Sequence, residues 1–441
     1  MNVFRMGLKS VIYRKKQYLS LFLVTIFGVA ISLFALFVVD GMLNALETKG
    51  KIYYGGDLMF IGSVSGEVII DNQKQTKAFL EMPHIEEKLE KLQTIFPPDS
   101  VIAERYEAGF GYMAFVFEGI TAQQRSLKGI NFNKEKKVFS ELNYIEGNSD
   151  EMAGSNGVLL SEPISKMLNI HVGDSLTFMF TTLSGYTDTA EVIVKGIFRD
   201  SSIFGTYTSY FDIDFLRNCV RAPLHTANRV AITLADKDKT DKKINEYQHK
   251  MESVFNMFPL VEKKQIYTEL VDNGTLKDDT FALIKLSANF EDIQILIDAM
   301  WLVVGFVIAM LVIIIVIGVS STYRVIIMKR INEIGIYMAI GMKKNRIIVT
   351  LLSETFALIV MGCIFGFILS LILCSLTPLV NLSFIPAFDI FLTNGVIKPI
   401  ISFSSFVILM IIVSVTTLLA VLFSIKKLIK ITPVEALSVI E

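Results

Sequence analysis

Residues that could support catalysis are few and scattered along this sequence. The sequence contains no G-x-x-x-x-G-K-[ST] phosphate loop, no H-E-x-x-H zinc motif and no nucleophile elbow. We find no pair of catalytic carboxylates, and the histidines lie far apart, at His84, His171, His225 and His249. We therefore expect no catalytic residues, no bound metal and no cofactor in this chain.

The most informative charged residues lie around one short loop and at the start of the apolar run that follows it. Residues 324–346 are rich in lysine and arginine, and Glu354 stands eight residues further on among apolar neighbours. A carboxylate is costly in lipid and normally has a partner or a wet site. We expect Glu354 to pair with a basic residue of this loop or of a partner protein. Simple exposure at the membrane interface is the alternative.

The loop itself has the pattern of a short amphipathic helix. Ile331, Ile334 and Met338 form an apolar stripe that could seat in a groove of a soluble partner, where the basic residues would meet acidic ones. Gly335 and Gly341 permit close approach or a sharp helix end. The sequence alone equally allows a helix that lies on the inner leaflet with its lysines on anionic lipid.

The elements that position this loop are long apolar segments. The chain is 52% hydrophobic and 19% charged, against about 25% charged in soluble proteins. Four segments are long enough to cross a bilayer, at residues 18–41, 300–323, 347–376 and 399–425. The first exceeds the length of a signal-peptide core, so we interpret it as a retained anchor. In the third, Gly362, Gly366 and Ser370 stand four residues apart and allow close helix packing or pairing.

Lysine and arginine are concentrated before the first span, between the second and third, and after the fourth. By the positive-inside rule, residues 1–17, 324–346 and 426–441 are cytoplasmic. Residues 42–299 and the short loop 377–398 then lie outside. The sequence predicts a multi-pass protein of the cell (inner) membrane with both termini in the cytoplasm. A net charge of −1 gives no indication of a nucleic-acid partner.

The outer region mixes helical and strand patterns. A helix is expected from Ile85 to Phe96, strands at 174–180, 190–198 and 229–234, and a helix at about 240–255. We predict an α+β extracytoplasmic domain with a β-rich subdomain inserted at about 138–221. From about Thr280 an apolar stripe predicts a helical stalk that runs on into the second span.

Several motifs carry a family resemblance. Glu333-Ile334-Gly335 followed by Ala339-Ile340-Gly341, the acidic position in Ser353-Glu354-Thr355-Phe356, and a closing Pro433-Val434-Glu435-Ala436-Leu437 resemble the FtsX-type permease domain, here at 300–435. In the outer region, 157–162, 168–174 and 192–198 resemble the core domain of MacB-type and lipoprotein-releasing (LolC/LolE-type) permeases. The layout is most similar to the LolC/LolE type.

The resemblance implies a non-catalytic permease subunit that works with a cytosolic ABC ATPase, which would bind the ATP and magnesium. It implies dimerisation with a second copy or a paralogue, and contact with membrane lipid and with lipoprotein cargo or a periplasmic acceptor. It identifies as coupling residues Lys329, Arg330, Ile331, Glu333, Ile334, Gly335, Met338, Ala339, Gly341, Lys343 and Lys344.

The function implied is the relay of ATP hydrolysis to the outer domain, for release or export of lipoproteins from the outer leaflet. Efflux of peptides or small molecules, as in MacB-type systems, is an alternative. A further alternative is regulation of cell-wall hydrolases without transport, as by FtsX itself. The outer domain of FtsX is usually much smaller than residues 42–299 of this chain.

Overall fold

A computed structural model describes residues 15–70, 73–109, 111–276 and 279–428. The expectations for most of the N-terminal segment and for the closing motif at 433–437 lie outside these residues. The chain divides into two compact units. We call Met1–Leu43, Leu296–Val380 and Val396–Glu441 the helical unit, and Asn44–Ile295 with Asn381–Gly395 the sheet domain.

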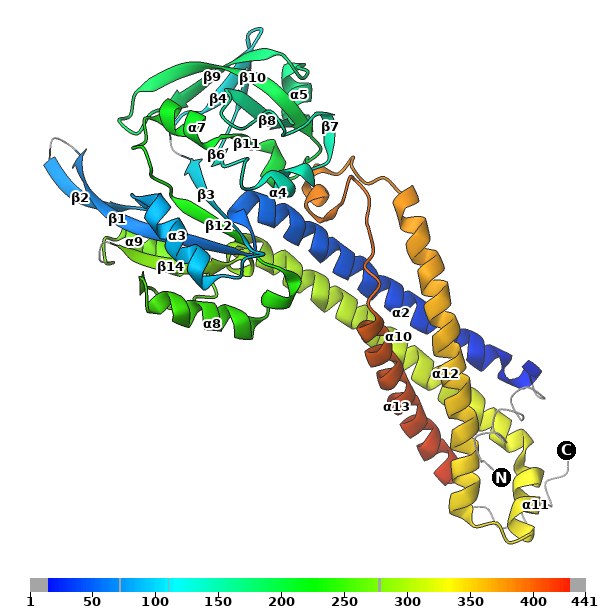
Figure 1. Ribbon diagram of the computed structural model, residues 1–441. Coiled ribbons are helices and arrows are strands. Elements are labelled where there is room, and N and C mark those ends of the chain that lie inside the picture. Colours follow the sequence, from blue (N-terminus) through cyan, green and yellow to red (C-terminus); the bar gives the residue numbers. More distant parts are fainter. Residues whose placement is uncertain (1–14, 71–72, 110, 277–278, 429–441) are drawn as a thin grey trace. The chain divides into compact units, whose positions relative to one another are not determined.

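In the described residues, the helical unit contains four long helices and one short one, which Figure 1 shows. Within the described residues, four helices are long and apolar enough to cross a membrane. Three of them are longer than the predicted spans, because polar residues continue the helix beyond the apolar run, whereas the fourth begins at Phe403 and not at residue 399. The helices are α2 (Lys15–Gly50), α10 (Glu291–Lys329), α11 (Ile331–Ala339), α12 (Lys344–Leu376) and α13 (Phe403–Leu428).

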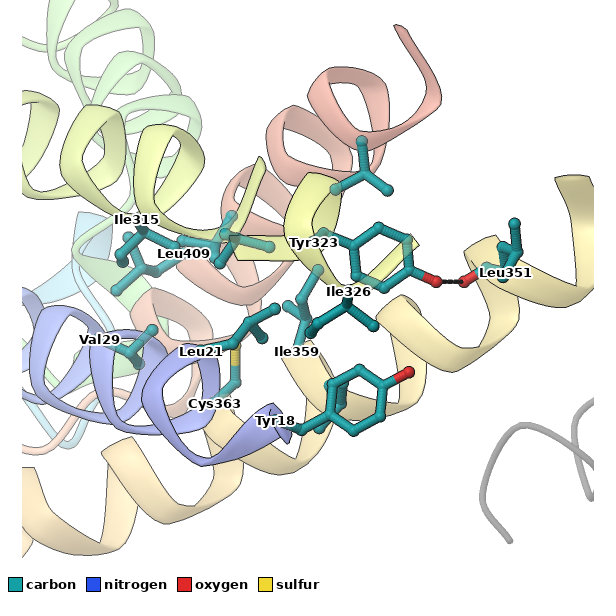
Figure 2. Packing of buried hydrophobic residues seen from close by; sticks show 14 of the residues in the cluster. Tyr18, Leu21, Val29, Ile315, Tyr323, Ile326, Leu351, Ile359, Cys363 and Leu409 are labelled. Atoms are coloured by element: carbon teal, nitrogen blue, oxygen red, sulfur yellow. Dashed lines mark hydrogen bonds between the residues drawn. The ribbon is translucent and has the colours of Figure 1, made fainter. Parts of the chain in front are cut away.

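Apolar side chains from these helices form one continuous core (Figure 2). Tyr18 and Leu21 of α2, Tyr323 of α10 and Ile359 of α12 are each no more than 1% exposed. The Tyr323 hydroxyl donates a hydrogen bond of 2.7 Å to the backbone oxygen of Leu351 on α12. The Tyr323 hydroxyl therefore has a hydrogen-bond acceptor inside an otherwise apolar core. An unpaired hydroxyl would be costly there.

Small residues bring α12 close to α2. A Cβ atom on Gly362 would lie 2.7 Å from Cγ2 of Thr25, and one on Gly366 would lie 2.9 Å from the backbone oxygen of Ile26. Such distances are shorter than carbon contacts allow, so larger residues at these positions would separate the helices. Ser370, one turn further along, is fully buried and donates to the Phe367 carbonyl at 2.7 Å.

The sheet domain is organised around one 14-stranded sheet of order β13-β14-β1-β12-β3-β6-β11-β8-β10-β9-β4-β5, with β2 on β1 and β7 on β10. Its strands are β1 (Leu58–Ile70), β2 (Gln73–Phe79), β3 (Val101–Ala108), β4 (Ala114–Phe117), β5 (Ile120–Gln123), β6 (Ser126–Ile130), β7 (Tyr144–Gly147), β8 (Gly157–Ser161), β9 (Ser175–Thr181), β10 (Thr187–Phe198), β11 (Thr208–Asp212), β12 (Arg229–Thr233), β13 (Asn256–Met257) and β14 (Thr280–Lys285).

Short helices and helical turns accompany these strands. They are η1 (Lys51–Gly55), α3 (Ile85–Ile95), α4 (Lys136–Ser140), α5 (Glu162–Leu168), α6 (Ile203–Thr206), α7 (Ile213–Val220), η2 (Asp236–Asp238), α8 (Asp241–Glu252), α9 (Lys264–Asp272) and η3 (Leu286–Asn289). Two more turns, η4 (Thr377–Leu379) and η5 (Pro386–Phe391), lie between α12 and α13.

The sheet domain has two lobes. In the first lobe, Leu58 and Phe60 of β1 face a core shared with α3 and α8, while Met59 and Ile61 face α9. Both faces of β1 are thus covered, as the alternation of side chains along a strand requires. The second lobe, which holds β4–β11, is inserted between β3 and β12, and these two strands pair directly with each other.

Two expectations for this region need correction. Residues 280–285 form strand β14, paired with β1, and the helix begins only at Glu291. Phe281 and Leu283 are buried on one face and Ala282 and Ile284 on the other, a continuous apolar run typical of a central strand. The inserted lobe also begins earlier than residue 138, because β4, β5 and β6 belong to it. These strands are too short to show a clear alternation.

Candidate functional site

Helix α11 is a short, well-delimited element between the second and third long helices. It follows Arg330 directly and ends at Ala339, two residues before Gly341, whose φ of +87° favours glycine. The backbone N–H of Gly341 donates to Met338 and that of Met342 to Tyr337, at 3.1 and 3.0 Å. Glycine therefore supplies the sharp helix end, and the chain then turns into α12.

A buried ion pair ties the start of α11 to α12. The Nη1 atom of Arg330 lies 2.6 Å from Oε2 of Glu354, and Nη2 lies 3.4 Å from Oε1. The Nε atom of Arg330 donates to Glu333 at 3.1 Å. The side chains of Arg330 and Glu354 are only 7% and 3% exposed. The loop residue that partners Glu354 in this structure is thus Arg330.

The first long helix joins the same cluster through Tyr18. Its hydroxyl donates to Oε2 of Glu354 at 3.1 Å and accepts from Nη1 of Arg330 at 3.3 Å. Burial disfavours the charge on Arg330, but the hydrogen bond and the attraction of Glu354 outweigh it and raise the pKa of Arg330. The arginine therefore stays charged, and α2, α11 and α12 are held at one point.

The two faces of α11 differ sharply in exposure. Ile334 is 5% exposed and packs with Met338 against the core of the helical unit, and Gly335 is buried. The opposite face exposes Ile336 (50%), Tyr337 (36%) and Ile340 (78%). The apolar stripe expected to meet a partner thus packs within the chain. The apolar surface left for a partner is the other face.

The remaining residues of the predicted coupling set surround this exposed face. Lys329, Ala339, Gly341, Lys343 and Lys344 are exposed, whereas Ile331 and Glu333 are half-buried. Among the described residues no group of three or more His, Cys, Asp or Glu side chains could hold a metal ion. The arrangement has the features of a docking element: a charged anchor on one side and an apolar surface with basic residues at its end on the other.

Sequence reasoning missed four residues of this site. Tyr18 was overlooked because a tyrosine at the start of an apolar run is also typical of a membrane interface. Ile336, Tyr337 and Ile340 were passed over in favour of the other stripe, although all three are apolar. The signal that could have found them is that α11 is apolar on two faces. Packing against the rest of the chain needs only one apolar face.

Comparison with known proteins identifies the domain to which this site belongs. Residues 304–433 match the family model described as FtsX-like permease C-terminal. The chain carries an FtsX-like permease domain. The matched range contains α11, α12, α13 and most of α10, and with them Arg330 and Glu354. Permeases of this family are membrane subunits that work with a cytosolic ABC ATPase, and α11 lies within the matched range.

A search of solved structures found a likeness to the extracellular domain of the noncanonic ABC-type transporter YknZ from Gram-positive bacteria. The two are 13% identical, with a TM-score of 0.27, over 44% of this chain and 87% of that one. At this TM-score the likeness carries no argument about this chain. A search of curated protein sequences found no match.

Proposed function

We propose that this FtsX-like permease relays ATP hydrolysis in a separate cytosolic ATPase to its sheet domain, through docking of α11 on that ATPase. The observation that carries the proposal is the exposed apolar face of α11, held in place from behind by the Arg330–Glu354 pair. A helix with one face anchored and the other apolar is suited to a groove on a soluble partner. The lysines after α11 would meet acidic residues at the rim of that groove.

The process served by this relay is, in our proposal, the release or export of lipoproteins from the outer leaflet. The length of residues 42–299 supports this choice over regulation of cell-wall hydrolases, because the outer domain of FtsX is usually much smaller. The bound species would be found by purifying the chain from native membranes and identifying co-purified proteins by mass spectrometry. Recovery of hydrolases in place of lipoproteins would favour the regulatory alternative.

Docking is tested by Ile336→Asp and Ile340→Asp. Burial of an isoleucine contributes about 1.5–3 kcal/mol, and about 1.4 kcal/mol corresponds to a tenfold change in affinity. Each substitution is therefore expected to weaken ATPase binding by about one to two orders of magnitude. The measurement is recovery of the ATPase that co-purifies with the wild-type chain, by pull-down from detergent extracts at two salt concentrations.

Two comparisons make this test specific. Ile334→Asp is expected to lower the unfolding temperature, because Ile334 is buried in the helical unit, whereas the two exposed positions are expected to leave it unchanged. The double variant Lys343→Ala, Lys344→Ala is expected to lose less binding, since exposed charge pairs contribute roughly 0–1 kcal/mol, and to lose least at high salt. Wild-type ATPase recovery with Ile340→Asp would contradict docking through this face of α11.

The proposed relay also requires α11 and the sheet domain on opposite sides of the membrane. In a Cys219→Ser background, the remaining cysteines are Cys363 and Cys374, both buried. We expect Lys136→Cys to react with a membrane-impermeant maleimide in intact spheroplasts, because Lys136 is 68% exposed in the sheet domain. Lys344→Cys is expected to react only after the membrane is opened. Equal labelling of both in intact spheroplasts would contradict the topology.

A further inference from the structure

The connection between the third and fourth long helices is part of the sheet domain. Residues 381–395 group with 44–295 and not with the helices on either side. Ile390, Phe391 and Leu392 of this segment are 5%, 5% and 0% exposed. A loop that merely joined two membrane helices would have no reason to bury three large apolar side chains in this way. We call residues 381–395 the docked segment.

One ammonium group holds the docked segment in place. Lys49 Nζ donates to Oδ2 of Asp389 at 3.0 Å and to the backbone oxygen of Asp389 at 2.6 Å. The same ammonium donates to Oδ1 of Asp200 at 3.1 Å. Oδ2 of Asp389 also accepts from the backbone N–H of Ser201 at 2.9 Å. The side chains of Lys49, Asp389 and Asp200 are only 16%, 3% and 11% exposed.

The cluster depends on its one cation. Lys49 sits between two carboxylates, and without it Asp389 and Asp200 would face each other in a poorly solvated place. Like charges so close repel strongly, and a buried carboxylate without a partner is costly. Lys49 also belongs to the last turn of α2, the helix that contains the first apolar run. The end of α2 and the connection between α12 and α13 are thus fastened to the same point of the sheet domain.

We propose that Lys49 and Asp389 are positioning residues for the relay, through which displacement of α12 and α13 reaches the sheet domain. This rests on the proposed function. With the latch formed by Lys49 and Asp389 intact, the sheet domain is attached through α2, through α10 and through the docked segment. Without it, the docked segment keeps only its buried apolar side chains, and the displacement caused by ATP hydrolysis in the ATPase docked on α11 is no longer transmitted along that route.

The test is Lys49→Met, which keeps the length of the side chain and removes its charge. In the nucleotide-free full chain, we expect amide hydrogens of 381–395 to exchange about tenfold faster or more, the factor for one lost charge-assisted hydrogen bond. In the complex with the co-purified ATPase, ATP hydrolysis is expected to persist. In the wild-type complex, we expect amide-hydrogen exchange in β3, β6 and β12 to differ between the nucleotide-free and vanadate-trapped states. In Lys49→Met, this difference is expected to be lost.

Matched variants separate the latch from general damage. Lys237→Met removes an exposed lysine of the same domain that pairs with Asp99, and should behave as wild type. Lys49→Arg keeps the charge and should restore most of the vanadate-dependent change. Asp389→Asn, which still accepts hydrogen bonds, should give an intermediate result and serves if Lys49→Met does not fold.

The outcomes are distinguishable from those for the proposed function. If the wild-type chain recruited no ATPase, the proposed function would be refuted. Amide-hydrogen exchange of residues 381–395 in the free chain would still test the latch. Wild-type recruitment together with an unchanged vanadate-dependent response in both Lys49→Met and Asp389→Asn would overturn this inference and leave the proposed function standing.

Discussion

Replacing Glu354 by alanine is expected to lower the free energy of unfolding of the helical unit by about 3–5 kcal/mol, because it deprives the buried charge of Arg330 of its buried carboxylate partner. Arg330 keeps the half-exposed Glu333, at 3.1 Å, and its hydrogen bond to the Tyr18 hydroxyl, which in turn loses its own acceptor. Thermal unfolding of the purified chain in detergent measures the loss. Faster amide exchange in α11 would locate it at the start of that helix.

The double variant Arg330→Met, Glu354→Leu provides the control. Removing both charges and filling the space with apolar groups is often neutral or stabilising where removing one is not. We therefore expect the double variant to unfold near the wild-type temperature while Glu354→Ala does not. If the single and double variants unfolded alike, the pair would contribute nothing beyond packing, and the view of Glu354 as the anchor of α11 would be wrong.

Glu135→Ala is expected to have an effect of similar size in the sheet domain. Arg105 and Glu135 form a buried pair, with side chains 3% and 2% exposed and Nε donating to Oε1 at 2.8 Å. Nη1 of Arg105 also donates to the backbone oxygen of Ile52, in the turn η1 that follows α2, at 2.6 Å. Loss of Glu135 leaves the arginine uncompensated, which costs about 3–5 kcal/mol. Denaturant unfolding followed by hydrogen exchange in β3 measures this cost.

The neighbouring residue supplies a matched control. Lys134 pairs with Glu104, and its side chain is 35% exposed, so Lys134→Ala is expected to cost only about 0–1 kcal/mol. The two substitutions are adjacent in the sequence, and each removes one charge. They differ in the burial of the side chain that is removed. Equal effects of Lys134→Ala and Glu135→Ala would show that burial of the Arg105–Glu135 pair does not determine its contribution.

The long helices could be predicted from the sequence because a bilayer imposes one simple requirement, about 20 apolar residues in a row. The strands expected at 174–180 and 190–198 were equally accessible, and the structure has them as β9 (Ser175–Thr181) and β10 (Thr187–Phe198), which pair with each other. The region from Thr280 was misread because an apolar run of this length is compatible with a helix or with a strand covered on both faces. Only the neighbours of β14, which lie far away in the sequence, decide between the two.

The coupling site shows a different limit of sequence reasoning. Motifs placed α11 and its glycines, but periodicity cannot tell which of two apolar faces is already occupied by the rest of the chain. Ile334 and Ile340 look equivalent in the sequence, yet one is 5% exposed and the other 78%. The partner of Glu354 was likewise left open between the loop and another protein, because a pairing between distant positions has no local signature.

The latch also bears on how the protein is made. Lys49 and Asp389 are 340 residues apart, so their contact cannot form until most of the chain has left the ribosome. At about 5–20 residues per second, this takes tens of seconds of synthesis. Once residues 44–295 have been synthesised, Lys49 and Asp200 are both present, but Asp389, the third residue of the cluster, is still missing. The sheet domain thus reaches its final form only after the third long helix and the segment beyond it have been synthesised. A nascent chain released before residue 389 would display an unfilled site to the proteases that remove incomplete membrane proteins.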